Sequence, residues 1–311
     1  MLRQITVTPA QAGARDSAQP ARAPQMTLSR PVSLAGRGLF HGARANVRLL
    51  PAAEHQGIVF RRVDLPGKPE VPARVEFVVA APRRTVLACG AARVETVEHL
   101  MAALAGLQID NCLVEIDAAE IPALDGSAMP FCEAILQAGA DAQTAPREVR
   151  RLVEPHAAAG DGGERIEVTP RFGDSLSVCY QLDYGADSPV PAGSFSVDVT
   201  PQHFLSQIAA ARTFVHQDEI ESLQQMGFGK HLTSQDIVVF GQDGSIQENA
   251  MRWPDEPVRH KILDCIGDLA LCGVPFAAQV IAHRSGHKLN HVMASVVSMI
   301  SGRGITWRRA A

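Results

Sequence analysis

The chain has 311 residues, of which 46% are hydrophobic, and a formal net charge of −4 from 29 basic and 33 acidic side chains. This composition is typical of a folded globular protein with a substantial core. The net charge provides no overall attraction to nucleic acid or to anionic lipid. We therefore expect a small-molecule substrate, no nucleic-acid partner and at most peripheral contact with a membrane.

Cysteine usage and the lengths of the apolar runs indicate the cellular compartment. Six cysteines are spread along the chain without CxxC spacing, mostly among apolar neighbours. This pattern predicts reduced, buried thiols in a cytoplasmic protein rather than a disulfide framework. No segment approaches the roughly 18 consecutive apolar residues that a membrane-spanning helix needs. We expect a soluble protein and take it to be a monomer.

The order of strand and helix signals predicts a first domain over residues 26–145. Residues 1–25 lack the continuous apolar core of a secretory signal and are predicted to be a disordered extension. Apolar and β-branched runs then predict short strands at 45–50, 57–62 and 112–116. Thr96 is a candidate N-cap of a helix that Gly106 ends, and a second predicted helix covers 130–139.

A polar run separates this part of the chain from a second series of elements. Residues 140–147, ADAQTAPR, are the best candidate for an interdomain linker. After them the same order recurs, with predicted strands and then helices at 165–168, 175–180, 216–226, 256–272 and 287–300. Two successive α+β domains, 26–145 and 146–311, fit this order better than alternating βαβ units.

One segment, RHKILDCIGDLA at 259–270, places polar residues at a spacing of four. On a helix, His260, Asp264 and Asp268 form one stripe with neighbours about 5–6 Å apart. A catalytic zinc site takes three protein ligands, commonly imidazole and carboxylate, and keeps a position for water. The competing interpretation is an ordinary solvated helix face. The metal hypothesis therefore requires a third ligand from elsewhere.

Glu98 and His99 supply the missing parts of the metal hypothesis. His99 is the candidate third ligand, and Glu98 is the candidate general base toward water, since successive side chains on a helix diverge. An isolated Glu-His pair has little meaning by itself. The hypothesis therefore depends on the fold bringing this pair to the 259–270 segment.

Three histidines at spacing four, His283, His287 and His291, would also chelate a metal on one continuous helix. Ser285 and Gly286 interrupt such a helix, so His287 is predicted to open a new helix and to reach into a cleft. The glycine-rich run nearer the N-terminus, GRGLFHG, lacks the spacing and context of a dinucleotide loop, and no dinucleotide site is expected.

Five segments of the chain together resemble a known enzyme family. They are TVEHLMAALAGLQIDN, EIPALDGSAMPF, ARTF, RHKILDCIGDL and RSGHKLN. In this order and at these separations they resemble the UDP-3-O-acyl-N-acetylglucosamine deacetylases of lipid A biosynthesis, from about Met26 to the C-terminus. The resemblance implies two α+β domains, each packing helices against a mainly antiparallel sheet, with a metal site between them. It also implies a zinc-dependent hydrolase that removes acetate from UDP-3-O-acyl-N-acetylglucosamine.

The resemblance implies a role for each candidate residue. The metal ligands it implies are His99, His260 and Asp264, with Glu98 as the base, the same four residues that their spacing suggested. The further implied roles are His287 as catalytic imidazole, Asp268 as the group that orients or charges it, Thr213 as oxyanion donor, Phe214 lining the reacting centre, and Lys261 near the substrate's diphosphate. Zn²⁺ suits these ligands, and Fe²⁺ is compatible with them.

Two segments differ from the family pattern. The family has Gly-Leu-His-(Ser/Thr)-Gly near the N-terminus, whereas this chain has GLFHG at 38–42, and a Lys-Gly-Gly-Ser stretch is replaced by KHLTSQD at 230–236. By resemblance both lie near the acyl-chain passage, where Leu39 is expected to bind substrate. The departures leave open a paralogous deacylase for a different N-acylated sugar or sugar nucleotide. A non-catalytic sugar-nucleotide binding protein is the alternative from another class.

Overall fold

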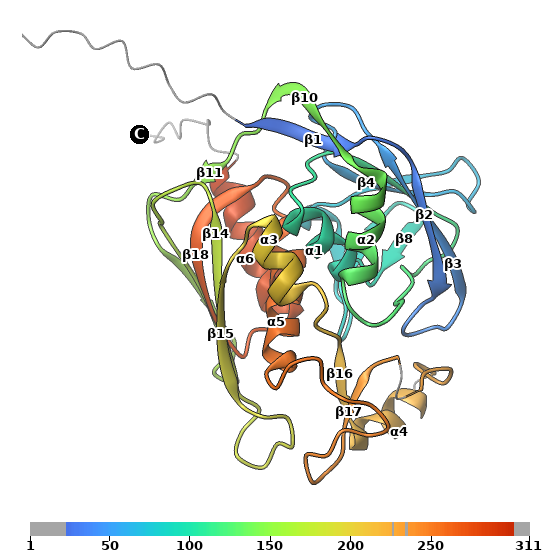
Figure 1. Ribbon diagram of the computed structural model, residues 1–311, viewed down its shortest axis with the longest axis vertical. Helices are drawn as coiled ribbons and strands as arrows, with labels where there is room; N and C mark the ends of the chain where they lie inside the picture. The colour runs from blue at the N-terminus through green and yellow to red at the C-terminus, as the bar shows by residue number, and fades with distance from the viewer. Residues whose placement is uncertain (1–22, 226, 234–235, 302–311) are drawn as a thin grey trace, which may run out of the picture.

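Helices in the centre of the molecule lie between two groups of strands, one from each half of the chain (Figure 1). The computed structural model describes residues 23–225, 227–233 and 236–301. The predicted α+β class is confirmed. Within these ranges, no helix combines the length and the apolar character needed to cross a bilayer.

The first sheet contains the strands predicted in the N-terminal half. They are β2 (Val32–Arg37), β3 (Arg44–Pro51), β4 (Ile58–Arg62), β5 (Glu70–Pro72) and β9 (Cys112–Ile116). The order is β2-β3-β9-β4-β5, and every pair is antiparallel except β4 with β9. Along β3 the side chains of Ala45, Val47 and Leu49 are buried while those between them are exposed. This alternation places one face of the sheet against the core.

A smaller antiparallel sheet precedes the first helix. It consists of β6 (Val78–Val79), β7 (Val86–Cys89) and β8 (Ala92–Glu95), and it follows a 3-10 turn, η1 (Val75–Phe77). The hairpin of β7 and β8 leads directly into the helix that carries Glu98 and His99.

Strands β1 (Pro24–Leu28) and β10 (Ala140–Pro146) pair antiparallel and correct two predictions. The run 140–147 is mostly a strand rather than a linker, because its backbone finds a hydrogen-bonding partner in β1 that its polar composition did not reveal. The predicted disordered extension 1–25 ends too late, since Pro24 and Gln25 belong to β1. The rest of that extension, residues 1–22, lies outside the described part of the chain.

Helices α1 (Glu98–Gly106) and α2 (Met129–Ala138) occupy the two regions predicted to be helical in this half. Helix α2 has proline in its first turn, and Gly139 follows it with a φ of 73°. Glycine adopts this positive φ without steric cost and ends the helix, as its position in the sequence predicted.

The start of α1 differs from the prediction, whereas its end does not. Thr96 is not the N-cap: it has a φ of 58°, its hydroxyl donates to Glu120, and Val97 precedes the helix without a side-chain cap. Gly106 is the last residue of α1, as predicted. A Cβ at Gly106 would lie 2.3 Å from the ring of Phe204, so the glycine leaves room for that ring.

The second sheet belongs to the C-terminal half. Its strands are β11 (Arg150–Arg151), β12 (His156–Ala159), β13 (Arg165–Thr169), β14 (Leu176–Leu182), β15 (Gly193–Asp198) and β18 (Phe276–His283). The order is β12-β13-β18-β14-β15, with β11 also on β18, and β18 runs parallel to β11 and β14 while the other pairs are antiparallel. Buried Val178 and Tyr180 direct one face of β14 toward the helices.

A small lobe extends away from the two sheets, at the bottom of Figure 1. It follows a short helical segment made of α3 (Pro201–His203) and the π-helical η2 (Phe204–Ile208). The lobe itself consists of β16 (Phe214–His216), α4 (Gln217–Gln225) and β17 (Val238–Phe240), with the two strands parallel.

Helices α5 (Glu256–Ala270) and α6 (His287–Ser301) confirm the predicted helices at the end of the chain. In α5 the predicted stripe of His260, Asp264 and Asp268 is buried, with exposed fractions of 3% or less. The interpretation of this stripe as a solvated helix face is therefore wrong.

All six cysteines are free. Four are buried and two are half-buried, as expected for structural thiols. Burial raises the pKa of Cys112, Cys132 and Cys272 to about 12, so these thiols stay protonated at neutral pH.

Helices α1 and α5 pack so closely that only a glycine fits between them. A Cβ added at Gly267 of α5 would lie 2.0 Å from the carbonyl oxygen of Glu98 and 3.2 Å from the amide nitrogen of Ala102. Both atoms belong to backbone, which cannot rotate away as a side chain can. The first turn of α1, which carries Glu98 and His99, is thereby held directly against α5.

Replacing Gly267 by alanine tests this packing. Alanine is the better helix former by about 1 kcal/mol, but its methyl group must push two backbones apart, and overpacking typically costs about 1–3 kcal/mol. We expect a net loss of unfolding free energy in denaturant titration. The control is Gly193→Ala, because a Cβ at Gly193 meets no atom within 4 Å. A Gly267→Ala protein as stable as the native chain would contradict the close packing.

Candidate metal centre and active site

A cavity of about 1070 Å³ is lined by residues from both halves of the chain. Nine of the ten residues predicted for the site line it: Leu39, Glu98, His99, Thr213, Phe214, His260, Lys261, Asp264 and His287. The tenth, Asp268, has no exposed surface and is hydrogen-bonded to His287. The fold therefore brings the whole predicted set together.

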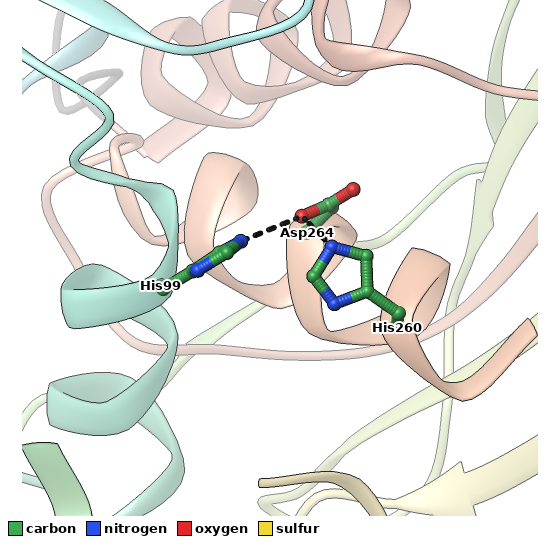
Figure 2. Close-up of side chains that lie close together, drawn as sticks. All are labelled: His99, His260 and Asp264. Atoms are coloured by element: carbon green, nitrogen blue, oxygen red, sulfur yellow. Dashed lines mark ion pairs between the residues drawn. The ribbon is translucent and has the colours of Figure 1, made fainter. Parts of the chain in front are cut away.

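Three buried donor side chains converge in the wall of this cavity. Figure 2 shows His99 reaching from α1 toward His260 and Asp264 on α5. The Nε2 atoms of His99 and His260 lie 3.7 and 3.4 Å from Oδ1 of Asp264. The two imidazole rings are nearly perpendicular, with centroids 5.0 Å apart. The donor atoms of the three residues all lie within 4.8 Å of one another.

The spacing and chemistry of these donors fit a divalent cation. Direct hydrogen bonds require a nitrogen-oxygen distance near 3 Å, which neither Nε2–Oδ1 pair reaches. Donors bound at about 2.0–2.1 Å around a tetrahedral cation lie about 3.4 Å apart. Two imidazole nitrogens and a carboxylate oxygen suit Zn²⁺ and also Fe²⁺. His99, His260 and Asp264 are thus able to hold such a cation and to leave a position for water.

Polar contacts behind the ligands orient two of them. His260 Nδ1 lies 3.0 Å from the Ala211 carbonyl oxygen, which only accepts, so Nδ1 carries the hydrogen and Nε2 presents its lone pair. Burial lowers the pKa of His260 to about 4, which keeps the imidazole neutral. Lys261 Nζ donates to Asp264 Oδ2 at 2.7 Å. Although burial opposes ionisation, the charge of Lys261 holds the pKa of Asp264 well below its usual range.

A buried ion pair holds the ARTF segment against α5. The Arg212 guanidinium donates to both carboxylate oxygens of Glu256, at 2.8 and 3.1 Å, and both residues are buried. The segment then places the ring of Phe214 edge-on to that of His260, with centroids 6.2 Å apart. Thr213 is anchored through its backbone, which donates to the carbonyl of Gly126 at 2.9 Å. Arg212 and Glu256 were not among the predicted residues.

Glu98 is suited to accept a proton. The residue is only 3% exposed. Its Oε2 accepts a hydrogen bond from the backbone N–H of Thr85 at 3.1 Å. Burial raises the pKa of Glu98, and the negative charges of Asp264 and Asp268 act in the same direction. A carboxylate with a raised pKa is a stronger base than an exposed one.

His287 and Asp268 form a charged pair beside the donor trio. His287 Nδ1 donates to Asp268 Oδ2 at 2.8 Å, which leaves Nε2 as the other ring donor. Burial alone would disfavour the imidazolium, but the Asp268 carboxylate raises the pKa of His287 to about 9. Despite burial, the two histidines beside it lower the pKa of Asp268. At neutral pH the pair is imidazolium and carboxylate.

The three-histidine cluster of the sequence is divided by the fold. His283 is the last residue of β18, whereas His287 and His291 lie one turn apart on α6. His291 Nε2 is 2.8 Å from the hydroxyl oxygen of Thr85 and 3.3 Å from Asp268 Oδ1. The metal-chelating interpretation of this cluster is therefore wrong, because a strand and a helix carry its members in different directions.

The two segments that depart from the family pattern are in contact with each other. A Cβ at Gly42 would lie 2.3 Å from the imidazole of His231. Phe40 packs edge-on against Phe228, with centroids 5.5 Å apart, and Arg84 lies over the Phe40 ring at 4.2 Å. Phe40 and Leu232, one from each segment, both line the cavity, so the departures change adjoining parts of its wall.

Buried imidazole and carboxylate donors, beside a basic carboxylate and a charged imidazole, are characteristic of metal-dependent hydrolases. The family model for UDP-3-O-acyl N-acetylglycosamine deacetylase matches residues 25–298. The chain belongs to this family, as its motifs predicted.

Individual relatives support the same assignment. The chain is 40% identical over 274 residues to UDP-3-O-acyl-N-acetylglucosamine deacetylase of Myxococcus xanthus, a match covering 88% of this chain and 86% of that protein. It is 40% identical over 270 residues to the protein of the same name from Cellvibrio japonicus, covering 86% and 88%. It is 38% identical over 270 residues to the protein of the same name from Pseudomonas entomophila, a match covering 86% of this chain and 88% of that protein.

Removing single ligands should separate metal loss from unfolding. We expect His99→Ala to lose bound metal in elemental analysis while keeping most of its stability. Asp264→Ala should lose metal and also about 3–5 kcal/mol of unfolding free energy, because it leaves the Lys261 charge buried without its partner. Asp255→Ala, which removes a more exposed carboxylate at the start of the same helix, is the control. Full metal occupancy in His99→Ala would exclude it as a ligand.

Proposed function

We propose that this chain hydrolyses the acetamide of UDP-3-O-acyl-N-acetylglucosamine, releasing acetate in lipid A biosynthesis, with Zn²⁺ or Fe²⁺ bound by His99, His260 and Asp264. The observation that supports this most strongly is the convergence of that trio, Glu98 and His287 on one cavity in a member of the deacetylase family. A purely binding protein would have no need for a buried acid–base pair beside three metal donors.

Glu98 acts as the general base in this proposal. His99, His260 and Asp264 would hold a divalent cation, which would supply a water of near-neutral pKa and polarise the amide carbonyl. Glu98 lines the cavity next to His99, and its raised pKa favours acceptance of the proton that water loses during attack. The backbone N–H of Thr85 fixes one oxygen of Glu98, which leaves the other toward the cavity.

His287 supplies positive charge and a proton. With Nδ1 bound to Asp268, its Nε2–H is the donor that remains for the reacting group. The charge stabilises the oxyanion of the tetrahedral intermediate together with the Thr213 hydroxyl, and removal of one such donor typically costs about 10²–10³ in rate. We assign protonation of the leaving nitrogen to His287, because its pKa of about 9 keeps it charged at neutral pH.

The remaining parts of the cavity suit the other portions of such a substrate. Apolar side chains from the lobe line one region and would receive the acyl chain: Ile220, Leu223, Phe228, Leu232 and Val239. Leu39 and Phe214 would line the path to the reacting centre. Lys261 donates to Asp264 with one of three N–H bonds, and the others are available for a phosphate oxygen.

The proposal includes the organisation and setting of the protein. We divide the described chain near residue 145, because the sheet β2-β3-β9-β4-β5 ends before it and the sheet around β18 begins after it. The site then lies between the two domains. A monomer in the cytoplasm, with at most peripheral membrane contact, agrees with the composition.

Acetate release provides the direct test. Metal-loaded protein is assayed on UDP-3-O-acyl-N-acetylglucosamine with a series of acyl lengths, with and without chelator. Glu98→Gln should retain metal and lose about 10²–10⁴ of kcat, the usual contribution of a general base. Glu76→Gln, at an exposed glutamate paired with Arg74, is the control. Absence of acetate release at every acyl length would rule out the proposed substrate.

The rate should also depend on pH through the same two residues. His287 must be charged, so kcat falls as the pH rises past its pKa of about 9, and Glu98 must be ionised, so kcat falls at low pH. Asp268→Asn removes the charge that favours the imidazolium, and its basic limb should therefore lie at lower pH than that of the native enzyme. Both profiles are measured with saturating metal and substrate. Coincident basic limbs would contradict the assigned pair.

A further inference from the structure

Thr85 contacts both carboxylates of the acid–base machinery. Its backbone N–H donates to Glu98 Oε2 at 3.1 Å, and its hydroxyl oxygen lies 2.5 Å from Asp268 Oδ1. The residue has no exposed surface. Its carbonyl accepts the amide of Thr96, at 2.9 Å, just before α1 begins. Thr85 is therefore held rigidly at the point where the base and the acid pair meet.

The directions of the hydrogen bonds around Thr85 follow from which groups are able to donate. An ionised Asp268 only accepts, so the single hydroxyl hydrogen of Thr85 is directed to its Oδ1. That leaves the Thr85 oxygen as an acceptor for His291 Nε2, which is 2.8 Å away. His291 therefore carries a hydrogen on Nε2. The result is a chain of donors from His291 through Thr85 to Asp268.

Four side chains surround the Asp268 carboxylate in this arrangement, and three of them donate to it. Oδ2 receives His287 Nδ1 at 2.8 Å and Asn290 Nδ2 at 2.9 Å. Oδ1 receives the Thr85 hydroxyl, with His291 Nε2 at 3.3 Å. A carboxylate has about four lone-pair positions. Its plane is therefore determined by Thr85 and Asn290, which donate to it directly, and by His291, which orients the Thr85 hydroxyl.

We propose that Thr85 and His291 are positioning residues that hold the Asp268 carboxylate in the plane that His287 requires. Neither residue is among those that line the cavity, so both act through Asp268 rather than on substrate. Without them Oδ1 loses its partners and the carboxylate can rotate, which weakens and misdirects its bond to His287. The kinetic effects expected from this inference rest on the proposed function, whereas the hydrogen-bond arrangement around Asp268 does not.

Threonine substitutions give the first test. Thr85→Val keeps the shape but removes the hydroxyl, and Thr85→Ser keeps the hydroxyl. We expect Thr85→Val to lower kcat by roughly tenfold or more, the usual effect of losing a hydrogen bond to a charged group. KM and metal content should stay within about twofold, and Thr85→Ser should restore most of kcat. Thr27→Val removes another buried, hydrogen-bonded hydroxyl and is the control.

The second test measures the pKa of His287 directly, without substrate. The imidazole titration of His287 is followed by NMR in Zn²⁺-loaded protein labelled with ¹⁵N-histidine, for the native chain, Thr85→Val and His291→Phe. Both variants should move the midpoint to lower pH, though less than Asp268→Asn does. His283→Phe, in β18, should leave the midpoint unchanged.

The outcomes separate this inference from the proposed function. Unchanged kcat and an unchanged His287 midpoint in both Thr85→Val and His291→Phe would overturn the positioning role, even if the enzyme is fully active. A fall in thermal stability with no change in either quantity would do the same. A shifted midpoint in a protein that hydrolyses none of the acyl sugars would support the positioning role and count against the proposed substrate.

Discussion

The backbone contact between α1 and α5 at Gly267 determines how the site is assembled. Because no side chain separates the helices at this point, the first turn of α1 lies directly against the middle of α5. His99 is thereby brought to His260 and Asp264, and Glu98 is brought to the same wall of the cavity. The two helices come from different halves of the chain, so neither half contains a complete site. A substitution at a single glycine can therefore disturb the metal ligands and the base together.

The three carboxylates of the site are all buried, and their neighbours give them different properties. Asp264 is paired with Lys261, and Asp268 is surrounded by hydrogen-bond donors, so the pKa of each is lowered although both are buried. At Glu98 burial outweighs the nearby positive charges and the pKa is raised. The two compensated carboxylates remain charged and hold other groups in place. The third has a raised pKa and is therefore the better proton acceptor, and this difference explains how similar side chains within one cavity perform separate roles.

Local sequence made much of the site predictable. His260, Asp264 and Asp268 recur every four residues, and this spacing is sufficient to place them on one face of a helix. Glu98 and His99 were recognisable because a base next to a ligand is chemically useful. Thr85 gave no such signal, since it reaches Asp268 across 183 positions of the chain through a single hydroxyl. His291 was noticed only as part of a three-histidine spacing. Ser285 and Gly286 correctly indicated that a new helix begins at His287, but the spacing did not reveal that His291 contacts Thr85.

By itself the sequence determined the α+β class, the positions of the helices, the family and the ten residues expected at the site. The class and the helix positions depend on periodicity and on glycine and proline at element ends, which are local properties. The family, and with it the site residues Thr213, Phe214, Lys261 and Leu39, came from the order of motifs that resemble that family. Only the tertiary structure decided that the polar stripe of α5 is buried, that the run 140–147 pairs with β1, and which donors surround Asp268. Those outcomes depend on the segments that pack against each element. The partners come from distant parts of the chain, and neither composition nor spacing specifies them.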